Sequence, residues 1–126
     1  MPSVTVLAVD DQAIFRRTAR SLIEATPGFK QVGEAASGAE ALELAAALDP
    51  DLVLVDIRMP GMDGIETARR LAAVVPDAVV VLISIEEVPE LPSNLTAVGA
   101  AAHLRKQDLS TRTLSELWSA HGPRRV

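Results

Sequence analysis

The sequence predicts an α/β fold in which helices cover both faces of a parallel β-sheet. Five candidate strand segments alternate with segments of helical periodicity, and the third and fourth of them are hydrophobic at every position. Strands buried on both faces need such continuous runs, whereas a strand with one solvated face alternates polar and apolar residues. The predicted strands are residues 4–9, 29–35, 52–55, 78–83 and 101–105.

The predicted helices lie between these strands and after the last one. The first follows Asp10-Asp11 and stops at Pro27-Gly28, because proline and glycine together break helical periodicity. The next two cover residues 39–48 and 65–75, and the last covers residues 110–121.

The segment before the fifth strand departs from this regular pattern. Pro89 and Pro92 disfavour a helix there, since proline lacks the backbone N–H and restricts the residue before it. We therefore predict a short or displaced fourth helix, beginning near Ser93 as its N-cap and ending at Gly99.

Length and composition indicate one folded domain. The chain has 126 residues, of which 48% are hydrophobic and 23% charged, which excludes a disordered chain. We predict a domain over residues 1–121 and a short tail over residues 122–126. The apolar runs are far shorter than the roughly 20 residues of a membrane-spanning helix, the start lacks signal-peptide character, and cysteine is absent. These features favour a soluble cytoplasmic protein with no membrane partner.

The charge pattern argues against nucleic acid as a partner. The formal net charge is −5, and non-specific DNA binding depends on neutralising phosphates with lysine and arginine. The arginines form only short clusters, which are typical of solvated helix faces, so we predict no direct nucleic-acid binding. The largest clusters are Arg16, Arg17 and Arg20, then Arg69-Arg70 and Arg124-Arg125.

Three aspartates stand where predicted strands end. Asp10 and Asp11 close the first strand, and Asp56 follows the third. Sites in open α/β sheets form beyond the carboxyl ends of strands, so the three carboxylates converge if these strands are neighbours. Such a cluster repels itself and needs protonation or a cation. Hard oxygen ligands with room for water favour Mg²⁺.

Two further polar residues end later strands on the same side. Ser84 follows the fourth strand and Lys106 follows the fifth. A hydroxyl and an ammonium beside an acidic cation site are suited to a phosphoryl group, whose oxygens they would bind. Taken singly, Ser84 is equally consistent with a helix cap and Lys106 with a surface lysine.

With these residues in place, the chain resembles the receiver domains of bacterial two-component systems. The resemblance runs from Val4 to about Trp118, and its most specific part is the loop around Asp56, Leu54-Val55-Asp56-Ile57-Arg58-Met59-Pro60-Gly61-Met62-Asp63-Gly64. The amino-acid sequence of this loop most resembles that of receivers from the nitrate-response type of regulator. The resemblance implies a doubly wound sheet, flavodoxin-like, with strand order 2-1-3-4-5.

The resemblance also implies roles for the site residues. Asp56 would accept a phosphoryl group from a histidine kinase or phosphotransfer protein. Mg²⁺ would be bound by Asp11, Asp56 and the backbone carbonyl of Arg58, with Asp10 acting through a water. Ser84 and Lys106 would contact the phosphoryl group, and the only reactions would be self-phosphorylation from a donor and autodephosphorylation, so the chain is not otherwise an enzyme.

The residues expected to link the phosphorylation state of Asp56 to an output surface depart from the family pattern. Ile85 stands where the family has a small residue and crowds the entrance to the site. His103 stands where the family often has a switching aromatic residue, so we predict Ser84 and His103 as the switch pair, with a non-switching role for His103 left open. Gln107 replaces a proline that commonly follows a cis peptide bond, and a cis bond before Gln107 would cost roughly 2.5–4 kcal/mol, so we expect trans.

Arg58 and Glu86 each lie two residues beyond a site residue and are predicted to flank its mouth. We expect them to form an ion pair that limits water entry and tunes the lifetime of the phosphorylated state. Together with Ile85, Glu86 is thus predicted to border the site.

Output is expected on the face made by the fourth helix, the fifth strand and the last helix, toward a protein partner that the sequence does not identify. Homodimer formation also stays open. Three other interpretations remain: a pseudo-receiver that signals without phosphate, a receiver fragment of a longer DNA-binding regulator, and a Mg²⁺-dependent phosphotransferase acting on small molecules.

Overall fold

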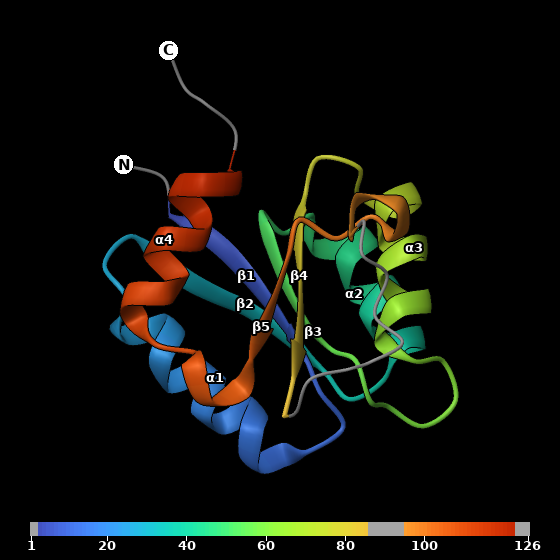
Figure 1. Cartoon of the computed structure of the whole chain (residues 1–126), viewed down its shortest axis with the longest axis horizontal. Helices are drawn as coiled ribbons and strands as arrows, with labels where there is room; N and C mark the ends of the chain where they lie inside the picture. Colours follow the sequence, from blue (N-terminus) through green and yellow to red (C-terminus); the bar gives the residue numbers. More distant parts are fainter. Residues whose placement is uncertain (1–2, 86–94, 123–126) are drawn as a thin grey trace.

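The computed structural model describes residues 3–85 and 95–122. Its centre is a five-stranded parallel sheet in the order β2-β1-β3-β4-β5, which confirms the predicted topology (Figure 1). The strands are β1 (Val4–Val9), β2 (Phe29–Ala35), β3 (Leu52–Asp56), β4 (Val79–Ser84) and β5 (Ala102–Arg105). The helices are α1 (Ala13–Ala25), α2 (Gly38–Leu48), α3 (Gly64–Val74) and α4 (Thr111–His121), with 3-10 turns η1 (Leu95–Val98) and η2 (Lys106–Asp108).

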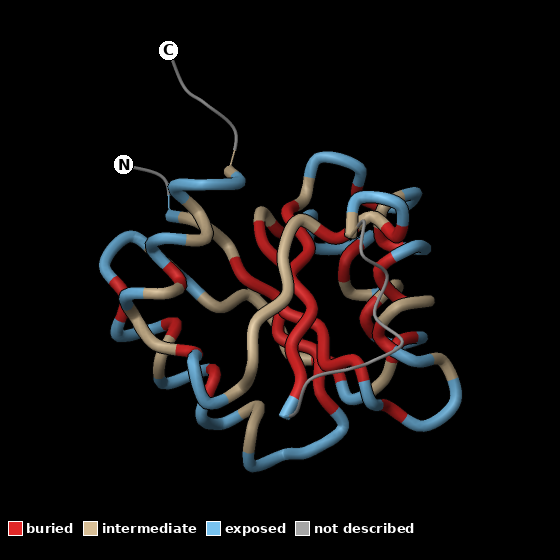
Figure 2. Tube along the Cα trace, viewed as in Figure 1, coloured by how far each residue is buried: buried red, intermediate tan, exposed pale blue. Residues whose placement is uncertain are grey.

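Helices cover the sheet on both faces and divide the core into two layers. Side chains of α1 and α4 pack on one face, and those of α2, α3 and η1 pack on the other. The central strands β3 and β4 are buried at every residue, whereas β5 is only half-buried (Figure 2). Burial on both faces explains why these central strands are apolar at nearly every position.

Polar contacts fix the ends of several helices and strands. Asp63 caps α3 by accepting a hydrogen bond of 2.9 Å from the backbone N–H of Glu66. Ser110 caps α4 in a capping box with Thr113. At the other end of the sheet, Asp51 Oδ2 accepts hydrogen bonds from Thr5 N at 2.9 Å and Thr5 Oγ1 at 3.1 Å, which joins the starts of β1 and β3.

The predicted boundaries agree with the structure to within a residue or two, with small corrections. Asp56 is the last residue of β3 and does not follow it, because its backbone continues the pairing with β4 opposite Ile83. The helix α3 starts at Gly64, one residue earlier than predicted, because Asp63 serves as its cap.

The segment before β5 agrees with the expectation of a short fourth helix as far as it is described. Its described part is the four-residue 3-10 turn η1, which ends just before Gly99, while the predicted start at Ser93, Pro89, Pro92 and Glu86 lie outside the described residues. The peptide bonds of the described ranges are all trans, including the one before Gln107, as predicted. Among the described helices, none has the length and apolar character needed to cross a bilayer.

Candidate functional site

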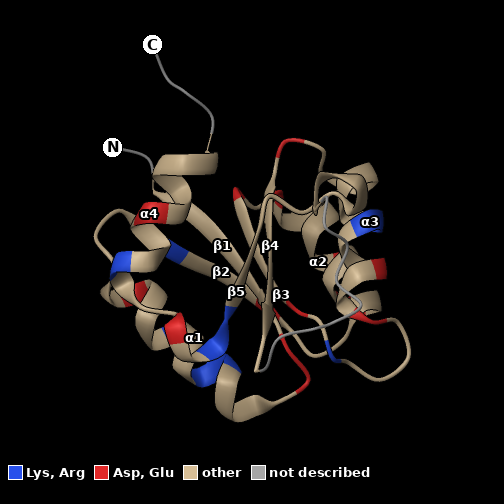
Figure 3. Ribbon diagram, viewed as in Figure 1, with Lys and Arg blue, Asp and Glu red and all other residues tan. Residues whose placement is uncertain are grey.

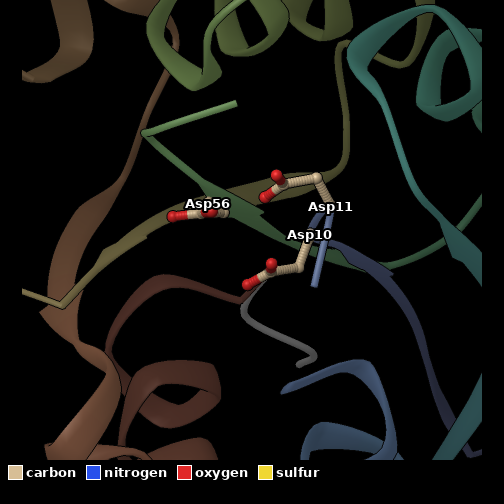
Figure 4. Close-up of side chains that lie close together, drawn as sticks. All are labelled: Asp10, Asp11 and Asp56. Carbon is tan, nitrogen blue, oxygen red and sulfur yellow. The ribbon is translucent and has the colours of Figure 1, made fainter. Parts of the chain in front are cut away.

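Three carboxylates meet at the carboxyl end of the sheet. Asp10 and Asp11 directly follow β1, and Asp56 ends β3, the neighbouring strand. One carboxylate oxygen from each lies within 4.8 Å of those of the other two, and Figure 4 shows the three side chains reaching the same space. The convergence predicted from the sequence is therefore present, because β1 and β3 are adjacent and end at the same level.

Asp10 is the most deeply buried of the three, with 1% of its surface exposed. Its Oδ1 accepts a hydrogen bond of 2.8 Å from the backbone N–H of Gln12. Its Oδ2 receives no well-directed hydrogen bond among the described residues, although Lys106 Nζ lies 2.6 Å away. The buried charge of Asp10 is therefore offset mainly by the ammonium of Lys106.

Asp56 is buried as well, with 5% of its surface exposed. Burial and the neighbouring charge of Asp10 raise the pKa of Asp56 from 3.8 to about 6, although Lys106 and a hydrogen bond from the Arg58 backbone oppose the rise. That hydrogen bond runs from Arg58 N to Asp56 Oδ1 at 3.4 Å. Asp11, in contrast, is exposed, so the cluster opens to solvent on its side.

Lys106 is the cation nearest to these carboxylates among the described residues. It comes from η2, directly after β5, and Figure 3 shows basic residues there beside the acidic ends of β1 and β3. Its Nζ lies 2.6 Å from Asp10 Oδ2 and 3.8 Å from Asp56 Oδ2, and 10% of its side chain is exposed. Lys106 therefore bridges the two buried aspartates, closer to Asp10.

The first turn of α1 forms a wall of the site that the sequence analysis missed. Gln12 Oε1 lies 3.5 Å from Lys106 Nζ, and the Phe15 ring centroid lies 4.4 Å from it. Arg16 donates a hydrogen bond of 2.7 Å from its guanidinium to the backbone carbonyl of Asp10 and lies 3.6 Å from Glu34. The sequence contained a pattern that could have predicted this wall. A helix that starts directly after Asp10-Asp11 brings residues three or four positions apart to one face, beside the aspartates.

The predicted switch residues touch each other. Ser84 is buried at the end of β4, and its Oγ lies 2.8 Å from His103 Nε2 on β5. Leu82 pairs with His103, so Ser84 and His103 share one face of the sheet. Ile85 is 60% exposed, and Glu86 lies outside the described residues, so its predicted pairing with Arg58 stays a prediction.

The donor set fits Mg²⁺ better than a softer metal. All the side-chain ligands available in the cluster are carboxylate oxygens, and Mg²⁺ prefers hard oxygen ligands while keeping several waters. The exposed side of the cluster at Asp11 leaves space for such waters. Three carboxylates share a single nearby ammonium among the described residues, and the pKa of Asp56 is raised partly by Asp10, so a divalent cation would compensate the remaining negative charge.

Comparison with known proteins assigns this arrangement to a family. A family model described as the response regulator receiver domain matches residues 6–117. The chain belongs to the response regulator receiver domain family. Receiver domains of this family typically bind Mg²⁺ in an acidic pocket and interact with histidine kinases or phosphotransfer proteins.

Similar proteins are response regulators. The receiver domain is 38% identical to the response regulator GacA of Pseudomonas viridiflava over 103 residues, which are 82% of this chain and 48% of GacA. It is 32% identical to the response regulator UvrY of Escherichia coli O6:H1 over 122 residues, which are 97% of this chain and 56% of UvrY. The chain thus spans about half the length of these curated relatives.

Solved structures agree with this assignment. The signal receiver domain of NarL from Mycobacterium tuberculosis superposes with a TM-score of 0.80 and 35% identity, covering 95% of this chain and 94% of that one. A LuxR-family two-component response regulator from Aurantimonas superposes with a TM-score of 0.82 and 29% identity, covering 94% of this chain and 84% of that one. The resemblance to nitrate-response type receivers is therefore confirmed at the level of the family.

Proposed function

We propose that this receiver domain accepts a phosphoryl group on Asp56 from a histidine kinase or phosphotransfer protein in a Mg²⁺-dependent reaction. The observation that carries the proposal is the meeting of Asp10, Asp11 and Asp56 within 4.8 Å, with Lys106 Nζ between Asp10 and Asp56. A nucleophilic carboxylate must be ionised, and a pKa of about 6 leaves Asp56 largely ionised at neutral pH.

In the proposed reaction, a carboxylate oxygen of Asp56 attacks the phosphorus of a phosphohistidine. An O–P bond forms as the P–N bond breaks, and the electron pair of the broken bond stays on the imidazole nitrogen. Lys106 can move from Asp10 toward the transferred group, where its ammonium offsets the charge of the phosphoryl oxygens. Autodephosphorylation is attack of water on the same phosphorus, which returns the carboxylate and releases phosphate.

The proposed metal ligands are Asp10, Asp11, Asp56 and the backbone carbonyl of Arg58, with Asp10 acting through a water. When bound, Mg²⁺ supplies positive charge at the phosphoryl oxygens. The backbone of the loop already bends toward the site, since Arg58 N donates to Asp56 Oδ1. An Asp11→Asn variant should bind Mg²⁺ more weakly, as measured by calorimetric titration, while its secondary structure stays unchanged.

The direct test of phosphorylation uses a small phosphodonor. Incubation with acetyl phosphate and Mg²⁺ should add the mass of one phosphoryl group to the wild type and none to Asp56→Asn. Asp63→Asn is a matched control, because Asp63 lies in the same loop and asparagine still caps a helix. A wild-type protein that gains no mass, and that does not respond to beryllofluoride with Mg²⁺, would contradict the proposal and favour a pseudo-receiver.

We further propose that Ser84 and His103 transmit the state of Asp56 to the output face around β5. The Ser84 hydroxyl is bonded to His103 at 2.8 Å, so donating that hydroxyl to a phosphoryl oxygen would alter the contact with His103. Beryllofluoride should therefore shift the NMR signals of the His103 ring in the wild type and much less in Ser84→Ala. Ser115→Ala, an exposed change on α4, should behave as the wild type. Equal shifts in Ser84→Ala would argue against the pair.

The proposed output partner is a class of protein surface rather than a named protein. We infer a protein surface or a further domain that reads the face formed by η1, β5 and α4. GacA and UvrY are about twice as long as this chain, and one solved neighbour is a LuxR-family regulator. An output domain on the same polypeptide is therefore one arrangement, and a separate output protein is the other.

A further inference from the structure

The lysine of the site rests against the start of α1. Gln12 is the residue before α1, and Phe15 lies in its first turn, whereas Lys106 comes after β5. The ammonium of Lys106 lies 4.4 Å from the centroid of the Phe15 ring and 3.5 Å from Gln12 Oε1. An ammonium this close to an aromatic face is attracted by the negative charge density of the ring.

The ammonium of Lys106 has two kinds of contact. The carboxylates of Asp10 and Asp56 lie 2.6 and 3.8 Å from it, so it is nearer Asp10. Its uncharged contacts are the Phe15 ring and the Gln12 amide oxygen. If Asp56 carries a phosphoryl group, the carboxylate contacts of Lys106 change, whereas the contact with the ring can persist, because attraction to an aromatic face tolerates small lateral shifts.

We propose that Phe15 is a positioning residue for Lys106. Its ring supports the ammonium while the ammonium moves from Asp10 toward a phosphoryl group on Asp56, and Gln12 gives a second, weaker support. This role rests on the phosphoacceptor function proposed above. It gives the first turn of α1 a role in the site, in addition to the roles of the aspartates, Ser84 and Lys106.

Burial makes the contact more effective than it would be at a surface. Only 10% of the Lys106 side chain is exposed, and Phe15 is half-buried, so water competes poorly with the ring for the ammonium. Lysine has a long flexible stem, and fixing it in one place costs rotamer entropy. An aliphatic side chain in place of the ring would still offer an apolar surface to the methylene groups of Lys106. It would not attract the ammonium, so the position of the ammonium would be less well fixed.

The test compares Phe15→Leu, which removes the ring, with Phe15→Tyr, which keeps it. With acetyl phosphate and saturating Mg²⁺, the phosphorylation rate should fall about three- to tenfold in Phe15→Leu, as expected for a partly desolvated cation–π contact, and change little in Phe15→Tyr. Phe29→Leu is the matched control: Phe29 is the other phenylalanine, also half-buried and packed against the same core layer.

Repeating the Phe15→Leu change in a protein without the Lys106 ammonium distinguishes positioning of that ammonium from a general loss of packing. In Lys106→Met, which keeps the stem and removes the ammonium, adding Phe15→Leu should cause no further slowing. The NMR signals of the Lys106 side chain next to Nζ should also lose their ring-current shift in Phe15→Leu and keep it in Phe29→Leu.

The outcomes are distinct. A wild-type rate in Phe15→Leu overturns the role of Phe15, and so does equal slowing in Phe29→Leu or in the Lys106→Met background. No phosphorylation of the wild type overturns the proposed function itself, and the ring-current shift then still decides whether the contact exists.

Discussion

The ionised form of Asp56 should destabilise this protein when no cation is present. Burial and Asp10 raise the pKa of Asp56 from 3.8 to about 6, so the folded state holds its proton more tightly than the unfolded state. Since the native state binds more protons over this range, the free energy of unfolding falls as the pH rises from about 4 through about 6. Above that range, the destabilisation is fully present.

The size of the effect follows from the shift. About two pKa units correspond to about 3 kcal/mol, which is an upper bound because the cluster opens to water beside the exposed Asp11. Asp56→Asn removes the charge while Lys106 keeps its nearer partner, Asp10, at 2.6 Å. We therefore expect Asp56→Asn to be more stable than the wild type by about 1 to 3 kcal/mol at pH 8.

The assay is urea unfolding of both proteins in EDTA at pH 4 and at pH 8. The difference between them should be large at pH 8 and small at pH 4, where most of the wild-type aspartate is protonated. Replacing EDTA with Mg²⁺ at pH 8 should stabilise the wild type more than the variant. Asp77→Asn, a change at an exposed turn, should give no such pH-dependent difference. If Asp56→Asn gains nothing at pH 8, or gains equally at both pH values, the electrostatic account of the cluster is wrong.

Two further predictions concern the frame that holds the site. Asp51→Ala should lower the free energy of unfolding by about 1 to 3 kcal/mol, because it removes the acceptor of two hydrogen bonds from Thr5; urea unfolding would measure this, and an unchanged midpoint would contradict it. Gly64→Ala should cost about 3 kcal/mol, the upper end of the usual range for overpacking, because its Cβ would lie 2.2 Å from the backbone oxygen of Asp56. Gly61→Ala in the same loop meets no atom within 4 Å and bears only the strain of a φ of 74°, about 1 to 2 kcal/mol, so thermal denaturation should rank Gly64→Ala as clearly the worse of the two.

The order and type of the elements could be predicted from sequence because each depends on local patterns. Continuous apolar runs such as residues 79–83 specify strands buried on both faces, and Pro27-Gly28 specifies where α1 must stop. The candidate site was predictable for a related reason. Aspartates that directly follow strands must gather at the carboxyl edge of a parallel sheet, so Asp10, Asp11 and Asp56 could be grouped once β1 and β3 were taken as neighbours.

Distances and competing partners were decided only by the tertiary structure. The sequence placed Lys106 near the acidic cluster, but it could not tell that the ammonium lies nearer Asp10 than Asp56, nor that the Phe15 ring stands beside it. Those contacts depend on how the start of α1 packs against the turn after β5, across a separation of some ninety residues. Likewise, strand register alone brought Ser84 and His103 to one face, where the hydroxyl meets the imidazole. Residue type and order thus determined which groups reach this edge of the sheet, and packing between distant segments decided which of them touch.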